Sequence, residues 1–309
     1  MNSNNSDYRP SEIITIKKDQ AGQRIDNFLF TYLKGIPKTR IYKMLRKGEV
    51  RVNKGRIKPV YRLKPDDMVR LPPVKLEMNK PKVSANLNQV KVLEERIIYE
   101  SNRLLIINKP SGIAVHGGSG DSYGVIEALR SLRPDAQYLE LVHRLDKLTS
   151  GCLMIAKKRS TLRYLHEQLR EHRIQKTYQA WVWGHWPEQL TEIDEPILTR
   201  RFANGDRKSV VDPDGKSSKT LFKCLKRTKK LSLIEAKPKT GRMHQIRVHC
   251  AWAGHPICGD SKYLKDESLV RKHKRLYLHA QRLKFKERPD ADYEFVTAIS
   301  DSFEQLLTA

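Results

Sequence analysis

The chain has 309 residues, of which 60 are Lys or Arg and 35 are Asp or Glu, giving a formal net charge of +25 at pH 7. This excess predicts a polyanionic partner, with nucleic acid the strongest candidate and an anionic membrane surface the second. A membrane span is not expected, because no apolar run approaches the roughly 20 residues that cross a bilayer. The polar N-terminus lacks an apolar signal core and the spacing of the four cysteines indicates no pairing, so we expect a cytoplasmic protein with reduced thiols.

The N-terminal part of the chain predicts a small module behind a tail. Residues 1–11 are polar and predict a disordered tail, whereas residues 12–75 predict a compact basic domain. Apolar residues recur at helical spacing over 25–33 and again over 41–45, so two helices are expected, the second ended by Gly48. The segment VRVNKGRI that follows predicts a tight hairpin with turn residues Asn-Lys-Gly.

This module is unusually basic. From Lys38 to Arg70, twelve residues are basic and three are acidic, a local balance of +9. Such a density on a helix and a hairpin suits phosphate binding, although a solvated surface is the alternative interpretation. The residues that we expect to contact RNA are Arg40, Lys43, Arg46, Lys47 and Arg51.

The module resembles the alpha-L RNA-binding domain, the kind found in ribosomal small-subunit protein four. The matching segments are QRIDNFL, PKTRIYKMLRKGEVRVNKGRIK and LKPDDMVRLP. The resemblance covers about the first quarter of the chain. It implies binding to structured RNA through the second helix and the hairpin.

A larger domain follows a linker. Residues 76–90 carry Pro, Lys and Asn without a sustained period, so we interpret them as the linker and assign residues 91–309 to the second domain. Hairpins outnumber strand-helix-strand crossovers in this domain, so the expected fold class is α+β with a mixed, mainly antiparallel sheet. In chain order the patterns predict strands at 97–100 and 104–108, helices at 123–132 and 159–172, a strand at 177–184, and a hairpin formed by LFKCLKR and LSLIEAK.

The most informative segment is LVHRLDKLTSG, in which Asp146 stands between two apolar runs. The first run ends at Val142 and the second begins at Gly151, so both predict buried strands. A charged Asp at such a junction must be solvated or held by partners, because a lone buried charge is very costly. A structural salt bridge to basic neighbours is one interpretation, and a carboxylate kept ionised for chemistry is the other.

Two further segments and one group of possible metal ligands contain candidate functional residues. NKPSGIAVHGGSG (108–120) is a glycine-rich loop that lacks the spacing of a phosphate-binding P-loop. TGRMHQIRVH (240–249), if helical from His244 to Val248, presents Arg247 for pairing with a carboxylate. Potential zinc ligands also gather here, but they lack tight Cys-x-x-Cys pairs, so we expect no metal. These residues are His244, His249, Cys250, His255 and Cys258.

Six motifs in order identify the larger domain as similar to the RluA-type family of pseudouridine synthases. They are NKPSGIAVHGGSG, LVHRLDKLTSG, QKTYQAWVWG, PKTGRMHQIRVH, AGHPICGDSKY and LYLHAQRLKF, running across residues 97–285. The resemblance implies the pseudouridine synthase fold. It also implies isomerisation of uridine in large-subunit ribosomal RNA, free or in a precursor particle, by a monomer that needs no cofactor and no metal.

The resemblance also implies roles for individual residues. Asp146 matches the family's essential Asp, which attacks the sugar or takes a proton from it. Tyr178 matches the Tyr that packs on the target base, and Arg247 the Arg that pairs with the Asp. Arg144 matches an Arg that fills the space left by the flipped nucleotide. The other residues that we expect to contact the substrate are His143, Lys109, Arg242 and His244.

One position departs from the family pattern, and two other functions stay open. Relatives often carry an acidic or polar residue where this chain has Leu148; because HRLD and TSG are intact, we expect activity to be retained and any change to concern a local contact or substrate preference. A non-catalytic RNA-binding factor would explain the charge, but not Asp146, Tyr178 and Arg247 at active-site positions. A nuclease using the histidines of the HRLD and MHQIR segments would shorten RNA, whereas an isomerase leaves its length unchanged.

Overall fold

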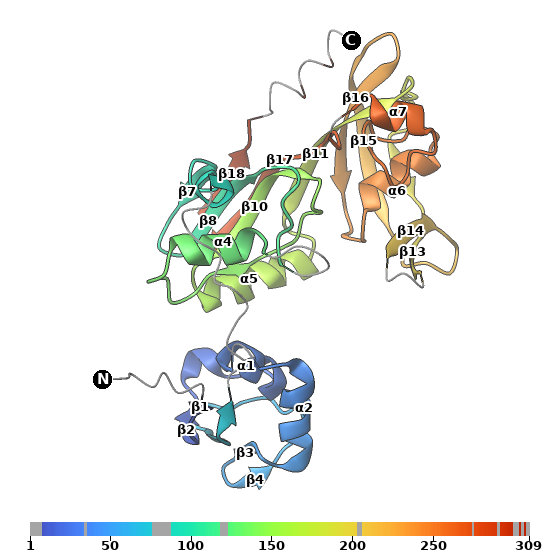
Figure 1. The fold of residues 1–309 in the computed structure, drawn as a ribbon. Coiled ribbons are helices and arrows are strands. Elements are labelled where there is room, and N and C mark those ends of the chain that lie inside the picture. The colour runs from blue at the N-terminus through green and yellow to red at the C-terminus, as the bar shows by residue number, and fades with distance from the viewer. Residues whose placement is uncertain are drawn as a thin grey trace. The chain divides into compact units, whose positions relative to one another are not determined.

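The chain folds into two compact units, Met1–Lys82 and Val83–Ala309 (Figure 1). Each unit has its own apolar core, so each is described by itself. The computed structural model describes residues 8–33, 36–75, 88–117, 123–202, 206–273, 275–288 and 291–298, together with Phe303 and Leu306.

The N-terminal unit packs two helices against a small sheet, as the sequence predicts. α1 (Ile25–Tyr32) and α2 (Lys38–Lys47) share one core, and Gly48 ends α2 in the left-handed conformation with φ 68°. The sheet has the order β2-β5-β3-β4, and β1 pairs with β6. The remaining bounds are Tyr8–Arg9 (β1), Glu12–Thr15 (β2), Lys18–Gln20 (η1, a 3-10 helix), Arg51–Val52 (β3), Gly55–Arg56 (β4), Met68–Leu71 (β5) and Val74–Lys75 (β6).

The ends of this unit differ from the sequence expectation. Tyr8–Arg9 falls in the expected disordered tail, yet it forms β1 against Val74–Lys75. Residues 1–7 of that tail and residues 76–87 of the expected linker lie outside the described residues. The last part of the linker begins α3 (Asn88–Lys91), which belongs to the second unit.

The second unit is built on one mixed sheet, which confirms the expected fold class. Among the described residues the sheet has ten strands, in the order β12-β15-β16-β11-β17-β10-β8-β7, with β18 beside β17 and β9 beside β10. All pairings are antiparallel except that of β10 with β17. The strands are β7 (Ile97–Glu100), β8 (Leu104–Lys109), β9 (Glu140–Leu141), β10 (Ser150–Ala156), β11 (Gln175–Trp183), β12 (Glu192–Asp194), β15 (Lys219–Arg227), β16 (Leu231–Pro238), β17 (Leu278–Arg288) and β18 (Ala291–Val296).

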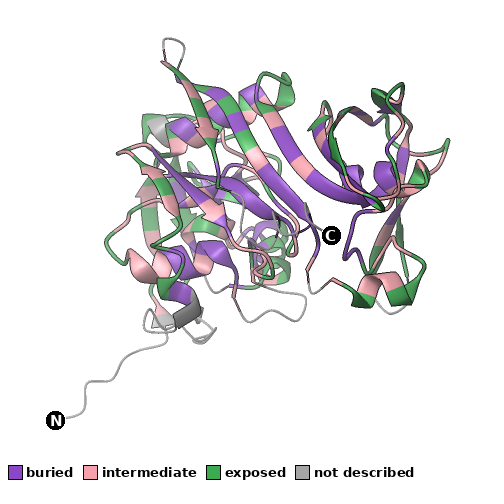
Figure 2. Cartoon of the chain, turned by 90° about the horizontal axis from the view of Figure 1, so that it is seen from above, coloured by how far each residue is buried: buried purple, intermediate pink, exposed green. Residues whose placement is uncertain are grey.

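The central strands are apolar on both faces because each face carries a separate core. Alternate residues of β8 and β10 pack in two clusters, one with α4 (Val125–Leu132) and the other with α5 (Arg159–Arg170). Such two-sided burial explains the continuous runs LLII and CLMIA. Figure 2 shows these buried residues along the long strands.

Beyond the sheet, one end of the unit carries a helix and a separate hairpin. α6 (Gln245–Trp252) contacts β14, β15 and β16, and β13 (Ile197–Arg201) and β14 (Arg207–Val211) form a two-stranded sheet (Figure 1). The short α7 (Glu267–Arg271) follows. None of the described helices is long and apolar enough to cross a membrane.

Gly151 explains why the TSG element contains glycine. Its φ is 111°, and a Cβ atom there would lie 2.3 Å from the backbone oxygen of Ala280 on β17. Only a residue without a side chain permits this approach. The close contact holds the start of β10, and with it the turn that contains Asp146, against β17.

Candidate active site

Three of the predicted residues meet in one pocket of about 120 Å³. Asp146 comes from the turn before β10, Tyr178 from β11 and Arg247 from α6, so the sheet and the helix bring together positions about 100 residues apart. The Asp146 side chain is 32% exposed, which leaves its carboxylate accessible from the pocket.

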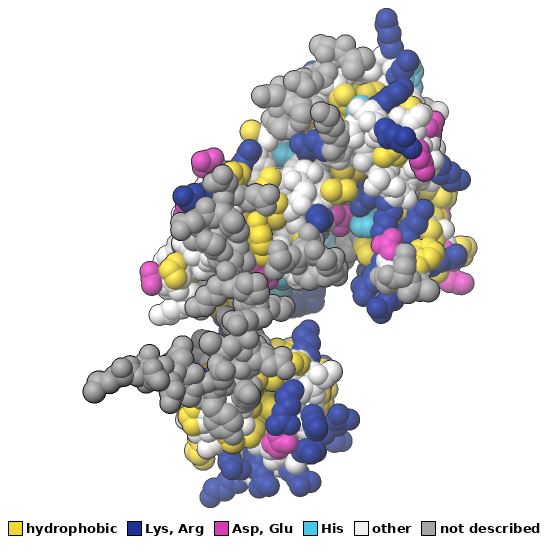
Figure 3. Space-filling model, in the orientation of Figure 1, with side chains coloured by type: hydrophobic (Ala, Val, Ile, Leu, Met, Phe, Trp, Pro, Cys, Tyr) yellow, Lys and Arg dark blue, Asp and Glu magenta, His cyan; other side chains and the backbone are white. Residues whose placement is uncertain are grey.

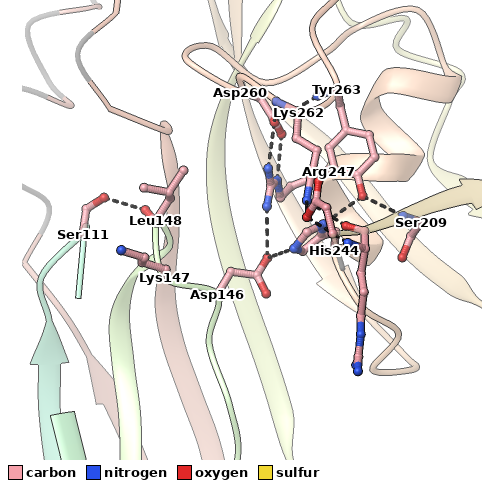
Figure 4. A network of polar contacts seen from close by, with 12 residues as sticks. Ser111, Asp146, Lys147, Leu148, Ser209, His244, Arg247, Asp260, Lys262 and Tyr263 are labelled. Carbon is pink, nitrogen blue, oxygen red and sulfur yellow. Dashed lines mark hydrogen bonds and ion pairs between the residues drawn. The ribbon is translucent and has the colours of Figure 1, made fainter. Parts of the chain in front are cut away.

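The backbone of the Asp146 turn is clamped by the glycine-containing loop NKPSG. Ser111 donates its hydroxyl to the Leu148 carbonyl at 2.6 Å, and Gly112 N–H donates to the Lys147 carbonyl at 2.9 Å (Figure 4). The Leu148 side chain packs against the main core. The position that departs from the family pattern therefore contributes its backbone oxygen and an apolar side chain.

Lys109 belongs to this clamp and does not face the substrate. Its side chain is fully buried, and its ammonium donates to the carbonyls of Pro110, Ile113 and Lys147 at 2.8–3.1 Å. Burial lowers the pKa of Lys109 to about 7, with the Asp146 charge acting in the opposite direction. The structure thus places the Lys109 ammonium against three backbone carbonyls, inside the protein and not among the lining residues of the pocket.

Arg247 is held by a carboxylate that the sequence analysis did not single out. Its Nε and Nη2 both donate to the Asp260 carboxylate at 2.8 Å, while Nη1 lies 3.5 Å from Asp146 Oδ2 (Figure 4). Arg247 and Asp260 are 5% and 0% exposed. Such a two-pronged contact fixes the plane of a guanidinium. Asp260 therefore anchors Arg247, and Arg247 presents one remaining N–H edge to Asp146.

His244 is the second neighbour of Asp146. Its Nε2 lies 3.7 Å from Asp146 Oδ2, and its Nδ1 lies 2.8 Å from the Tyr263 hydroxyl. Tyr263 also accepts the Ser209 N–H at 3.1 Å, and its ring lies against the Arg247 guanidinium. Burial lowers the pKa of His244, so the imidazole is neutral at pH 7. A hydrogen on Nε2 fits both contacts, because Nδ1 then accepts from Tyr263.

The backbone around His244 corrects the expected helix. His244 has φ 55° and precedes α6, which runs from Gln245 to Trp252, so the helix begins one residue later than expected and continues past Val248. Gln245 is buried and holds the preceding turn: its Oε1 accepts from the Thr240 hydroxyl and the Arg242 N–H at 2.7 and 3.0 Å. The exposed Arg242 lines the pocket and donates to the Ser217 carbonyl.

Tyr178 forms one wall of the pocket. It is 9% exposed, and its hydroxyl makes no hydrogen bond within the described part of the chain. Burial and the nearby Asp146 charge raise its pKa well above the ordinary value for a tyrosine. The hydroxyl is therefore protonated at neutral pH and available to a ligand.

His143 and Arg144, which precede Leu145 in the chain, have different surroundings. Arg144 is exposed, lines the pocket, and makes no ion pair with any described residue. The His143 Nε2 instead accepts the Met154 N–H at 3.2 Å, and burial lowers the pKa of His143 to about 3. His143 therefore supports the strand next to the site as a neutral side chain.

The possible metal ligands do not converge. The His249 ring contacts Thr220 and the Glu195 carbonyl, and the His255 ring contacts the Trp183 carbonyl. Cys250 and Cys258 are buried thiols. Within the described ranges, no three His, Cys, Asp or Glu side chains lie in an arrangement that could hold a metal ion.

The N-terminal unit presents a basic face of its own. Lys43, Arg46 and Lys47 are exposed on α2, opposite the buried Ile41 and Met44. Figure 3 shows Lys and Arg side chains gathered over α2 and the β3–β4 hairpin. Two of the predicted RNA contacts are partly engaged within the unit. They are Arg40, which pairs with Glu49 at 3.0 Å, and Arg51, which donates to the Gly48 carbonyl.

The chain belongs to the RNA pseudouridylate synthase family, whose model matches residues 103–252, and an S4 domain model matches residues 23–69. It is therefore an enzyme that isomerises uridine to pseudouridine in RNA. Ribosomal large subunit pseudouridine synthase C of Pasteurella multocida is 54% identical over 89% of this chain and 86% of its own length. The protein of the same name from Escherichia coli is 53% identical over 89% of this chain and 88% of its own length.

Solved structures agree with this assignment. Human RNA pseudouridylate synthase domain containing 4 superposes with a TM-score of 0.59 and 26% identity, covering 71% of this chain and 94% of its own. Human RNA pseudouridylate synthase domain containing 1 gives a TM-score of 0.56 and 25% identity, covering 69% and 92%. The expected pseudouridine synthase fold and N-terminal RNA-binding domain are thus confirmed.

Proposed function

We propose that this enzyme converts specific uridines of large-subunit ribosomal RNA to pseudouridine, with Asp146 acting at the sugar of a flipped-out uridine. The main observation that supports this proposal is the accessible Asp146 carboxylate, which shares one pocket with Tyr178 and the anchored Arg247. The names of the relatives that are more than half identical support the choice of RNA. We further propose that the enzyme works as a cytoplasmic monomer, as the composition and the family resemblance lead us to expect.

The reaction requires the bond between uracil N1 and the sugar to break and a bond from C5 to form. The proton on C5 leaves, and N1 takes up a proton, so the mass of the RNA does not change. A carboxylate beside the sugar can attack it or take a proton from it, as carboxylates do at other glycosidic carbons. Arg247 keeps a positive charge 3.5 Å from the Asp146 carboxylate and can hold its orientation.

The remaining groups hold the nucleotide. Tyr178 offers its ring for stacking on the uracil and its protonated hydroxyl for a hydrogen bond. Arg144 is exposed at the rim, where it can occupy the space left in the RNA stack. His244 and Arg242 line the same pocket and can contact the nucleotide. The basic face of the N-terminal unit supplies sequence-independent contacts to phosphates.

The test uses large-subunit ribosomal RNA with tritium at uridine C5. The purified chain should release tritium without added metal or nucleotide, while a denaturing gel shows intact RNA. Asp146→Asn should abolish release and keep RNA affinity within about twofold, because only the reacting carboxylate changes. Full activity of this variant would refute the role of Asp146, and shortened RNA would indicate a nuclease.

A further inference from the structure

A second concavity, which we call the basic groove, adjoins the active-site pocket. Its volume is about 490 Å³, and it shares Arg144, Lys176 and Gly241 with the pocket. Its ionisable lining is entirely basic or imidazole, with no carboxylate among the described lining residues. These ionisable residues are His143, Arg144, His172, Lys176, Lys237 and Lys239.

Lys176 stands at the junction of the pocket and the basic groove. It lies two residues before Tyr178 on β11, where the pairing with β17 shifts register between Thr177 and Gln179. Both Lys176 and Tyr178 line the pocket. No ion pair or hydrogen bond joins the Lys176 ammonium to any described residue. By contrast, the groove residue Lys237 pairs with Glu235 at 2.7 Å.

This ammonium is both desolvated and without a counter-charge. Burial lowers the pKa of Lys176 below the ordinary lysine value, and no carboxylate offsets the effect. Keeping a cation in such a place costs free energy. An anion that enters the groove would remove the cost, so the site favours an anionic ligand over a neutral one.

Gly241 leaves the ammonium open to such a ligand. A Cβ atom at Gly241 would have one heavy-atom neighbour within 4 Å, the Lys176 Nζ at 4.0 Å. The backbone at position 241 is not in the left-handed region, so a side chain can be accommodated there. Because the chain has glycine, the space before the ammonium stays clear.

We propose that Lys176 binds one phosphodiester of the RNA strand next to the flipped uridine, and that the strand continues along the basic groove. The inference rests on the proposed function and adds to it the path of the flanking strand. A uridine whose sugar lies at Asp146 has a phosphate within one nucleotide on either side, and Lys176 lines the same pocket as Asp146. Phosphate contacts of this kind fix the position of an RNA without reading its sequence.

The experiment uses the full chain and a fragment of large-subunit ribosomal RNA that the wild type modifies. Two further RNAs carry a neutral methylphosphonate in place of the phosphate on one or the other side of the target uridine. The wild type should bind one of these about tenfold more weakly than the natural RNA, because the methylphosphonate cannot form the charge-assisted hydrogen bond. Lys176→Met should bind the natural RNA about tenfold more weakly and show no preference between it and that methylphosphonate RNA.

Two additional variants make the result specific. Lys223→Met removes an exposed lysine of β15 that lines a different concavity, so it should behave as the wild type. Lys176→Arg keeps the charge and should keep the preference for the natural RNA. The salt dependence of binding should also become shallower in Lys176→Met, by about 0.7 in the log–log slope for a single-stranded contact.

Gly241→Asp tests the same contact without altering the lysine. The new carboxylate would lie beside the Lys176 ammonium and compete with the phosphate, so binding of natural RNA should weaken about tenfold. If Lys176→Met keeps the full preference for natural RNA, or Gly241→Asp binds as the wild type, the proposed phosphate contact is wrong. Tritium release by the wild type in the same assays would leave the proposed function standing.

Discussion

Asp260 should contribute strongly to the free energy of unfolding, although we assign it no direct part in the reaction. Asp260→Asn removes the charge that faces Arg247 and replaces one of two acceptors with a donor, while the volume stays the same. Both partners are almost fully buried, and breaking one side of a buried pair costs about 3–5 kcal/mol. Since Asn keeps one acceptor, we expect a loss near the lower limit, about 3 kcal/mol.

Unfolding in urea, followed by tryptophan fluorescence, measures this loss for the second unit of the chain. All four tryptophans, at positions 181, 183, 186 and 252, lie in the second unit. With a denaturant slope of about 3 kcal/mol per molar, the midpoint should fall by about 1 M. Activity should fall as well, because Arg247 loses its fixed orientation toward Asp146.

Asp146→Asn is the matched control, since it makes the same chemical change on the other side of the same arginine. Its carboxylate is a third exposed and lies 3.5 Å from Arg247, so its removal should cost less than about 1 kcal/mol. Arg247→Met combined with Asp260→Asn should cost at least about 2 kcal/mol less than the sum of the single variants. Equal midpoints for the two Asp→Asn variants would refute the anchoring argument.

Two more predictions concern pH and RNA affinity. Burial, followed by the Arg275 charge, lowers the pKa of His279 from 6.5 to about 4, so the unfolded chain holds a proton that the folded chain lacks between these values. His279 should therefore contribute a fall of about 1.4 kcal/mol per pH unit in the free energy of unfolding as pH drops from 6.5 to 4. The total slope should be shallower in His279→Gln, as urea titrations at several pH values will measure. Identical pH slopes would contradict this reasoning. The second prediction replaces the exposed basic residues of α2 with Ala. The log–log salt slope of RNA binding should become shallower by about 0.7 for each phosphate that is no longer neutralised, as filter binding at several salt concentrations will measure. An unchanged slope would mean that α2 does not contact RNA. These residues are Lys43, Arg46 and Lys47.

Much of the fold can be predicted from the sequence because it is encoded locally. The helical spacing over 25–33, the Asn-Lys-Gly turn and the apolar runs of β8 and β10 each give a signal within ten residues. Asn53 and Lys54 do adopt the positive φ angles that a tight hairpin requires. The meeting of Asp146, Tyr178 and Arg247 follows from the order of the family motifs and not from any local pattern.

The predictions that are wrong or missing concern tertiary contacts. A single Asp in a loop has no periodicity, so nothing local marks Asp260 as the partner of Arg247, although it stands in the motif AGHPICGDSKY. The sequence does not show that three carbonyls surround the Lys109 ammonium, so its burial could not be predicted. The left-handed backbone of His244 could not be predicted either, because it lies directly before α6 in a segment whose pattern is helical.

The place of β17 in the sheet has a consequence for the timing of synthesis. This strand comes from residues 278–288, yet it lies between β11 and β10, which carry Tyr178 and the turn of Asp146. Until that late segment has been translated, the two halves of the site have no common strand to join them. The strand that joins the two halves of the site is therefore made after both of them.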